Sequence, residues 1–210
     1  MEAAGKTAER NPRGQGDLLR DRLIDAALAL LNDGHEPSGI SIRGVTRQAG
    51  VSPTAFYLHF DSRRQLMRAL VERTFSDFRR RIAEGSGAGG DPLERLIGAG
   101  VAYIGFARDE PERYRLIFAS DWDEEGIKED PEDTVEVADA AFADLVGLIA
   151  GCMDPDETDP VELDTIALGM WSGLHGYATL CHLSPGLAAL SDRQYASLLA
   201  GAWLGRASGA

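Results

Sequence analysis

The chain has 210 residues, a net charge of −13 and only two cysteines, Cys152 and Cys181. This length suits one compact unit with a smaller appended one, and so few cysteines exclude a disulfide framework. No stretch has the apolar length of a signal peptide or a membrane span, so we expect a soluble cytoplasmic protein without a membrane partner.

The charge is divided unevenly along the chain. Residues 1–81 contain 14 Lys and Arg against 10 Asp and Glu, a net charge of +4. Residues 82–210 contain 7 against 24, a net charge of −17. A positive N-terminal part in an acidic protein suits a polyanionic partner, because neutralising phosphates releases condensed counterions. Charge alone fits a solvated surface equally well.

The N-terminal part is predicted to begin with a flexible polar arm, residues 1–16. Apolar residues then recur at helical spacing, which predicts an amphipathic helix over residues 17–33 that Gly34 ends. A second, short helix is expected after Ser41, which is a suitable N-cap, and Gly50 is expected to end it and supply a tight turn.

A third helix is predicted directly after this turn. Ser52 is its expected N-cap and Pro53 its first residue, where a missing N–H has no cost. Phe56 and Phe60 are four residues apart, so both can point inward. Three side chains are left facing outward: Thr54, Tyr57 and Leu58.

A fourth helix is expected to open with the capping box S-R-R-Q at residues 62–65 and to run to about Glu84. Two short helices joined by a glycine turn and braced by longer helices are typical of a helix-turn-helix, whose second helix enters the major groove. Exposed hydroxyl and imidazole groups suit phosphate oxygens or base edges. The alternative is a generic turn inside a helical bundle.

The stretch ISIRGVTRQAGVSPTAFYLHFDSRRQLMRALVE resembles the DNA-binding domain of the tetracycline-repressor (TetR) family. The resemblance covers residues 17–77 and rests on the Ala-Gly-Val-Ser turn, the Tyr-x-His-Phe motif and the basic residue that follows. It implies an operator of double-stranded DNA as the partner. The residues expected to contact DNA are Arg43, Ser52, Pro53, Thr54, Tyr57, His59 and Arg63.

The resemblance divides these contacts by role. It implies that Tyr57, His59 and Arg63 bind phosphates and that Arg43 and Thr54 reach bases. The chemistry agrees, because an arginine can fork to guanine O6 and N7, and Arg63 lies in the first turn of a helix, beside free backbone N–H groups.

Two positions depart from the family pattern. Leu58 stands where the family often has a polar residue, so it either reads a thymine methyl group or only flanks the groove. Gly44 lies inside the second helix and lowers its propensity, which either lets the backbone approach DNA or is simply tolerated.

The remainder also reads as helical, which predicts an all-α fold of about nine helices. After the glycine-rich break at 85–90, helices are expected over residues 92–110, 111–120, 131–153, 160–183 and 191–206. These segments resemble the C-terminal domain of one branch of the TetR family, which carries a Trp-His-Gly cluster, here WSGLHG at 171–176. The resemblance implies an effector-binding and dimerisation domain over residues 78–210.

Aromatic and sulfur side chains in this part suit an apolar pocket with a few polar tips. The candidates for effector binding are Tyr103, Phe106, Tyr114, Phe118, Met170, Trp171 and His175. Each fits a place in the hydrophobic core equally well, and His175 fits a satisfied core histidine. Cys181 and His182 are not expected to bind a metal, because His175 lies about 10 Å from His182 along a helix. No cofactor is expected.

The final two helices pack into a four-helix dimer interface in the family, which implies a homodimer here. The expected interface residues are Gly169, Gly173, Gly176, Leu198, Leu199 and Ala202. The alternative is that these glycines serve packing within one subunit.

Three classes of function compete for this sequence. An enzyme is disfavoured because the chain lacks a G-x-S-x-G elbow, a phosphate-binding loop and an H-E-x-x-H pair. An interaction protein that no longer binds DNA would have lost its phosphate-contacting residues, and they are present. We expect a dimeric transcription regulator, most simply a repressor released by a small molecule.

Overall fold

Helices make up all the regular structure in the part of the chain that the computed structural model describes. That part consists of residues 15–87, 89–118, 131–154, 156, 159–183 and 190–207. It contains nine α-helices and one 3-10 turn, which confirms the expected all-α fold. The chain divides into two compact units, residues 1–70 and residues 71–210.

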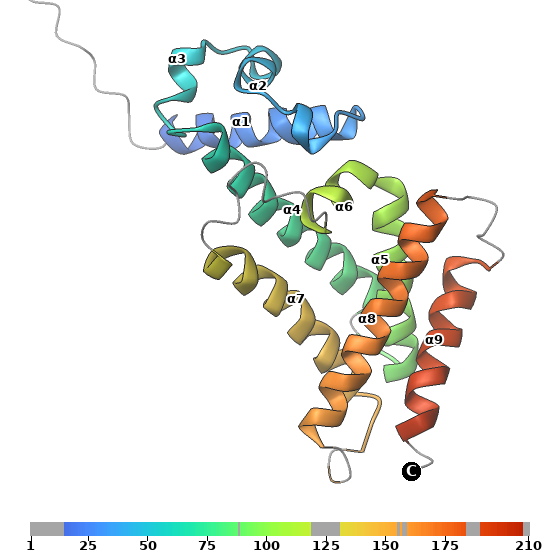
Figure 1. Cartoon of the computed structure of the whole chain (residues 1–210). Helices are drawn as coiled ribbons and strands as arrows, with labels where there is room; N and C mark the ends of the chain where they lie inside the picture. Colours follow the sequence, from blue (N-terminus) through green and yellow to red (C-terminus); the bar gives the residue numbers. More distant parts are fainter. Residues whose placement is uncertain are drawn as a thin grey trace, which may run out of the picture. The chain divides into compact units, whose positions relative to one another are not determined.

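The first unit holds three α-helices, one 3-10 turn and the start of a fourth α-helix (Figure 1). They are α1 (Gln15–Asn32), η1 (Pro37–Gly39), α2 (Ile42–Ala49), α3 (Pro53–Phe56) and the beginning of α4 (Arg63–Ser86). Helix α2 packs against both α1 and α3. Leu23, Val45, Phe56 and Leu66 are fully buried at the centre of this unit. Burial of each such side chain stabilises the folded state by about 1.5–3 kcal/mol.

Helix α4 begins at the predicted capping residue. The Ser62 hydroxyl accepts a hydrogen bond from the Gln65 N–H at 3.3 Å. The Gln65 side chain turns back to accept from the Asp61 N–H at 2.8 Å, one residue earlier than an ideal capping box requires. The division between the two units falls inside α4, as does the expected domain boundary after residue 77.

The second unit holds the rest of α4 and five further helices (Figure 1). They are α5 (Pro92–Asp109), α6 (Pro111–Phe118), α7 (Pro131–Ala150), α8 (Pro160–Leu183) and α9 (Asp192–Ala207). Helix α5 occupies the centre, in contact with α6, α7, α8 and α9. Its largely apolar sequence agrees with this position, because helices surround it on several sides. None of the described helices is long and apolar enough to cross a membrane.

Glycines allow α8 and α9 to pack closely against each other. A Cβ atom on Gly169 would lie 2.1 Å from the ring of Trp203, and one on Gly173 would lie 2.7 Å from the side chain of Leu199. The Tyr195 hydroxyl also donates a hydrogen bond to the Gly173 carbonyl at 3.1 Å. The two helices therefore form one hairpin within the chain.

The substitution Gly169→Ala tests this close packing. We expect it to lower the free energy of unfolding by about 1–3 kcal/mol, because the new methyl group must displace the Trp203 ring. The matched control is Gly147→Ala on α7, where no described atom lies within 4 Å of an added Cβ. The control should gain up to about 1 kcal/mol from helix propensity. Urea unfolding followed by circular dichroism measures both, and equal effects would contradict the packing argument.

Candidate functional site

The α2–turn–α3 segment is held by its own caps. The Ser41 hydroxyl accepts from the Gly44 N–H at 3.1 Å and starts α2. Gly50 ends α2 in the left-handed region, with φ of 67°, which a side chain would strain. The Ser52 hydroxyl then accepts from the Ala55 N–H at 3.2 Å, and α3 begins at Pro53. These observations confirm the predicted helix boundaries around the turn.

Side chains of α3 and the turn after it separate into two groups as predicted. Phe56 and Phe60 are buried and pack against each other, with ring centroids 5.4 Å apart. Thr54 is exposed, Tyr57 is 55% exposed and Leu58 is 74% exposed. The other predicted contacts are Arg43, Ser52 and Pro53, which are exposed, and His59, which is half-buried. Their roles at DNA stay predictions.

The Tyr-x-His-Phe motif lies just beyond the α-helix, whereas its resemblance to the family suggests a place within it. Helix α3 ends at Phe56, and the chain continues in tighter turns. The Leu58 N–H donates to the Ala55 carbonyl, and the His59 N–H donates to the Phe56 carbonyl, both in the i to i+3 pattern. The tightening brings Phe60 into the core and leads the chain into α4.

Arg63 binds the loop between α1 and α2. Its guanidinium donates to the carbonyl of Ile40, to that of Pro37 at 2.9 Å and to that of Ser38 at 3.3 Å. Three carbonyls gathered on one planar cation form a structural clamp within the first unit. The role of Arg63 at a DNA phosphate stays a prediction. The clamp gives the same residue a structural function in the first unit.

An aromatic cluster in the second unit brings together most of the predicted effector-binding residues. Phe118 is at its centre, with ring centroids 4.7 Å from Tyr114, 5.4 Å from His175 and 6.3 Å from Trp171. Tyr103 lies 5.9 Å from Tyr114 and 6.1 Å from Phe118. Edge-to-face and tilted arrangements of this kind add about 0.5–1.5 kcal/mol per pair to the burial of the rings.

The polar groups of the cluster form hydrogen bonds with one another. The Trp171 indole N–H donates to the Tyr103 hydroxyl at 3.2 Å, which lies 3.1 Å from the Tyr114 hydroxyl. The Tyr114 hydroxyl lies 2.6 Å from His175 Nδ1. Burial raises the pKa of Tyr103 well above its ordinary value and the pKa of Tyr114 to about 12, and it lowers the pKa of His175. Near pH 7 the hydroxyls therefore stay protonated and the imidazole stays neutral.

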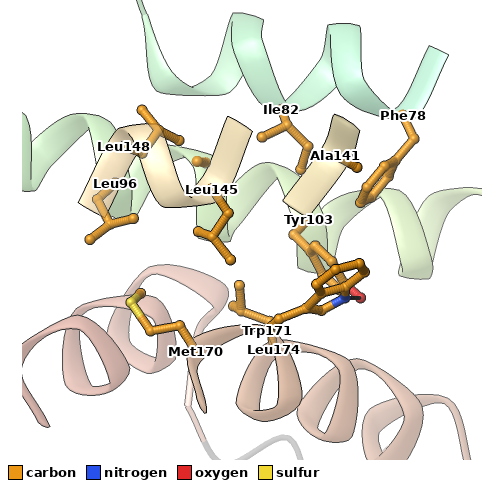
Figure 2. Close-up of a pocket in the computed structure, with 12 residues that line it drawn as sticks. Phe78, Ile82, Leu96, Tyr103, Ala141, Leu145, Leu148, Met170, Trp171 and Leu174 are labelled. Atoms are coloured by element: carbon orange, nitrogen blue, oxygen red, sulfur yellow. Dashed lines mark hydrogen bonds between the residues drawn. The ribbon is translucent and has the colours of Figure 1, made fainter. Parts of the chain in front are cut away.

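Two cavities adjoin this cluster. The first, cavity A, has a volume of about 40 Å³, and Figure 2 shows Tyr103 and Trp171 at one end of it and Leu96 and Leu148 at the other. Its walls are almost wholly apolar. The second, cavity B, has a volume of about 230 Å³ and lies along α6 and α8. It is lined by Ala107, Pro111, Tyr114, Arg115, Phe118, His175, Ala178, Thr179, His182 and Leu183.

Two protein-family profiles match separate parts of the chain. The family profile described as "Bacterial regulatory proteins, tetR family" matches residues 23–70. The profile described as "Tetracyclin repressor-like, C-terminal domain" matches residues 96–199, so the two together span well over half of the sequence. The chain belongs to the TetR family. TetR-family regulators are not enzymes, which removes the enzyme alternative.

Individual relatives share this fold and part of this sequence. An uncharacterized HTH-type transcriptional regulator of Mycobacterium tuberculosis is 32% identical over 95 residues, which are 45% of this chain and 46% of the relative. The chain thus matches about half the length of such curated relatives. A TetR-family transcriptional regulator from Streptomyces coelicolor superposes with a TM-score of 0.70 at 18% identity, covering 91% of this chain and 82% of that chain. A Rhodococcus protein of unknown function superposes with a TM-score of 0.72 at 26% identity, covering 93% of this chain and 98% of that chain.

The predicted effector-binding residues of this TetR-family chain separate by location. Tyr103, Met170 and Trp171 line cavity A, and Tyr114, Phe118 and His175 line cavity B. Phe106 lines neither cavity: it is 1% exposed and packs against Phe78 at 5.2 Å. This placement fits the alternative that Phe106 is a core residue.

Sequence reasoning missed most of the aliphatic lining. Cavity A also contains Leu145 and Leu148 of α7, and Phe142 of the same helix stacks on Trp171 at 5.5 Å. The apolar spacing 141, 145, 148 on α7 was a usable signal, because these positions share one helix face. Thr179, His182 and Arg115 of cavity B carried no comparable pattern.

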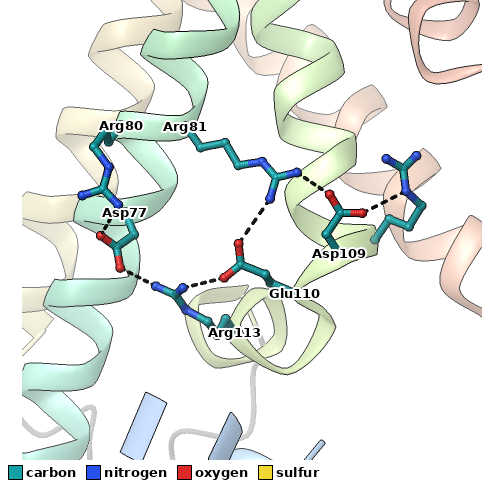
Figure 3. Close-up of polar contacts among 7 residues, drawn as sticks. Asp77, Arg80, Arg81, Asp109, Glu110 and Arg113 are labelled. Carbon is teal, nitrogen blue, oxygen red and sulfur yellow. Dashed lines mark hydrogen bonds and ion pairs between the residues drawn. The ribbon is translucent and has the colours of Figure 1, made fainter. Parts of the chain in front are cut away.

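An ion-pair network around the buried Arg113, also missed, joins α4 to the start of α6 (Figure 3). Arg113 is only 8% exposed, and its guanidinium donates to Asp77 at 2.6 Å and to Glu110. Arg81 donates to Glu110 at 3.2 Å and to Asp109. A buried arginine needs such partners, because an unpaired buried charge costs several kcal/mol.

The six predicted dimer residues of the TetR-family chain also divide into two groups. Gly169, Gly173 and Leu199 make contacts between α8 and α9 within one chain. This supports the alternative that these two glycines serve packing within one subunit. Leu198 is 60% exposed, Ala202 is exposed, and no described atom lies within 4 Å of a Cβ on Gly176. Leu198 is therefore a cleaner probe of association than Leu199.

Metal-binding side chains do not gather anywhere in the described ranges. No group of three His, Cys, Asp or Glu residues there could hold a metal ion. His182 Nε2 instead accepts a hydrogen bond from the Arg115 guanidinium, and Cys181 is a half-buried free thiol.

The substitution Arg63→Ala tests the structural clamp. We expect the free energy of unfolding of the first unit to fall by about 1–3 kcal/mol, because the backbone carbonyls lose a charged donor. Arg43→Ala is the matched control, since Arg43 is exposed on α2, and it should stay within about 0.5 kcal/mol of the original chain. Denaturant unfolding measures both variants. If both variants have the same free energy of unfolding, the clamp does not stabilise the first unit.

Proposed function

We propose that this chain is a DNA-binding transcription regulator, a repressor that binds a near-palindromic operator as a homodimer and is released by a small molecule. Residues 17–77 form the DNA-binding part in this proposal, and residues 78–210 bind the effector and the second copy. The observation that carries it is the capped α2–turn–α3 segment with its exposed polar side chains. The effector, the operator and the regulated genes are for experiment to identify.

The surface of the α2–turn–α3 segment supports the DNA-binding role. Arg43 on α2 and Thr54 on α3 are exposed, so both are available to base edges. Tyr57 is exposed just after α3, and its hydroxyl suits a phosphate oxygen. The net charge of +4 over residues 1–81 adds attraction to the phosphates of either strand.

Exposed apolar side chains on the last two helices support a homodimer. On α8 these are Val161, Leu168, Leu180 and Leu183, and on α9 the 60% exposed Leu198. Large apolar side chains that stay exposed on neighbouring helices are candidates for an interface with a second copy. A two-fold axis through α8 and α9 would place two DNA-binding parts on two half-sites, about one helical turn or a multiple of it apart.

Release by an effector follows from differential affinity. Helix α4 begins in the first unit and continues as part of the second, so the two units share one element of the chain. An effector that binds more tightly to a dimer with wrongly spaced DNA-binding parts lowers operator affinity. A tenfold difference in affinity supplies about 1.4 kcal/mol, and the coupling is reciprocal, so operator DNA weakens effector binding equally.

Recovery of bound DNA from the native genome is the experiment that tests this function. The recovered sites should contain a near-palindrome, and gel shifts should show weaker binding to an isolated half-site than to the full site. The logarithm of affinity should fall steeply with the logarithm of salt concentration, because phosphates are neutralised. A flat salt response, or equal affinity for half and full sites, contradicts a dimeric DNA-binding protein.

Two variants distinguish base reading from phosphate binding. Arg43→Ala should relax preference at particular base pairs by about 1–3 kcal/mol, because a forked contact to guanine is lost. Tyr57→Phe should weaken binding to all sequences about equally, because only a phosphate contact is lost. Selection of operator variants by each protein measures the difference. If Tyr57→Phe changes sequence preference while Arg43→Ala does not, the two roles are reversed.

Leu198→Glu tests the dimer. We expect a folded monomer that no longer binds the full operator, because a charge on an exposed apolar face blocks association while the core stays intact. Leu18→Glu is the matched control for association, because Leu18 is 64% exposed on α1, in the first unit. Sedimentation reports the mass and circular dichroism the helical content. A Leu198→Glu protein that remains dimeric removes α9 from the interface.

A further inference from the structure

The hydrogen bonds of the aromatic cluster indicate which nitrogen of His175 carries the proton. The cluster contains three certain donors: the Trp171 indole N–H and the hydroxyls of Tyr103 and Tyr114. Its acceptors are the two tyrosine oxygens, the Thr179 hydroxyl beside Tyr114 and, if it is unprotonated, His175 Nδ1. The distances are 3.2 Å from Trp171 to Tyr103, 3.1 Å from Tyr103 to Tyr114 and 2.6 Å from Tyr114 to Nδ1.

The distances in this network fit a chain of donors that ends at His175 Nδ1. Trp171 donates to Tyr103, Tyr103 to Tyr114, and Tyr114 to His175 Nδ1, so each donor has its own acceptor. The Tyr103 hydroxyl also lies 3.4 Å from Nδ1, so this nitrogen can accept from either tyrosine. The 2.6 Å separation between the Tyr114 hydroxyl and Nδ1 is typical of a hydroxyl donor and is shorter than the roughly 2.9 Å usual for an N–H donor. The neutral imidazole of His175 therefore carries its hydrogen on Nε2.

Cavity B is the space beside this imidazole. His175 lines the cavity together with the rings of Tyr114 and Phe118, which supply apolar walls. His182 also lines the cavity, and its Nε2 accepts from the Arg115 guanidinium, which leaves the ring hydrogen on Nδ1. The Thr179 hydroxyl, which is hydrogen-bonded to Tyr114, can donate or accept. The polar atoms around cavity B thus offer mainly hydrogen-bond donors.

The one formal positive charge on the lining is already balanced. The Arg115 guanidinium pairs with Glu112, at 3.0 Å and 3.3 Å from its two carboxylate oxygens, and the Glu112 side chain is only 12% exposed. A carboxylate entering cavity B would have to compete with this internal ion pair. A pure hydrocarbon would cover the His175 N–H without offering it an acceptor, which costs free energy.

We propose that cavity B binds an uncharged, mainly apolar molecule whose carbonyl oxygen accepts a hydrogen bond from His175 Nε2–H. This rests on the proposed effector-binding function and names the chemical class of its ligand: aryl or alkyl ketones, lactones and esters. The aromatic walls hold the apolar body, and the His175 donor selects for the carbonyl.

The first test needs no ligand. Nitrogen-15 NMR of the four histidines in the full-length protein at pH 7 reports the tautomer of each, and a spectrum of His175→Gln assigns His175. We expect the Nε2–H tautomer. In Tyr114→Phe the Nδ1 resonance should move, because it loses its donor, while Nε2 keeps its hydrogen. An Nδ1–H tautomer or an imidazolium at His175 overturns the proposal.

The second test compares three matched probes: 4-phenylbutan-2-one, butylbenzene and 3-phenylpropanoate. The ketone should bind at least about tenfold more tightly than the hydrocarbon and the carboxylate, and should shift the His175 Nε2 signal. His175→Phe should abolish the preference while keeping an aromatic ring, and His175→Gln, which retains a donor, should keep part of it. His35→Gln is the control, because His35 bonds to the Leu30 carbonyl in the first unit.

Each outcome of the probe experiment is decisive. Binding of the hydrocarbon or the carboxylate as tight as that of the ketone, or no binding of any probe, overturns the proposed ligand class. So does a ketone preference that survives in His175→Phe. Gel shifts on recovered operator DNA keep the two proposals separate: operator binding without ketone binding contradicts only the cavity proposal, whereas ketone binding without any DNA binding contradicts only the regulator.

Discussion

A polar group that leaves water must find a partner, and this constraint organises both units of the chain. Arg63 meets it by gathering the carbonyls of the loop between α1 and α2, which fixes the loop that leads into α2. Arg113 meets it with Asp77 and Glu110, which fixes the start of α6 against α4. The hydroxyl of Tyr103 meets it through Trp171 and Tyr114, which ties α5 to α6 and α8. The surfaces and cavities available for recognition lie around these groups.

The elements that could be predicted are those determined by short-range chemistry. A serine before a helix, a proline at its first position and a glycine after its last turn act within four residues, so the caps at Ser41, Gly50 and Ser52 were readable. Apolar spacing also revealed the amphipathic helices. Where α3 ends was not readable, because its early end at Phe56 depends on how the chain enters α4.

The parts that escaped prediction depend on residues far apart in the chain. Arg63 lies 23 residues from Ile40, and Arg113 lies 36 residues from Asp77, so no local sequence pattern predicts either contact. The same limit applies to the aromatic residues. Phe106 and Phe118 look alike in sequence, yet the first packs in the core under Arg81 and Arg113 and the second lines cavity B. Only the three-dimensional arrangement of α5, α6 and α8 separates a pocket wall from a core ring.

Neighbouring residues of α9 face opposite environments, and this constrains how the helix can change length. Leu199 is buried against Gly173, whereas the preceding Leu198 is exposed. One inserted residue turns everything after it by about 100° around the helix axis. An insertion before Leu198 would therefore bring a different set of side chains onto the α8 contact and carry the buried set toward solvent. Substitutions on the exposed face of α9 can accumulate freely as far as the fold is concerned, but single-residue insertions and deletions within it cannot.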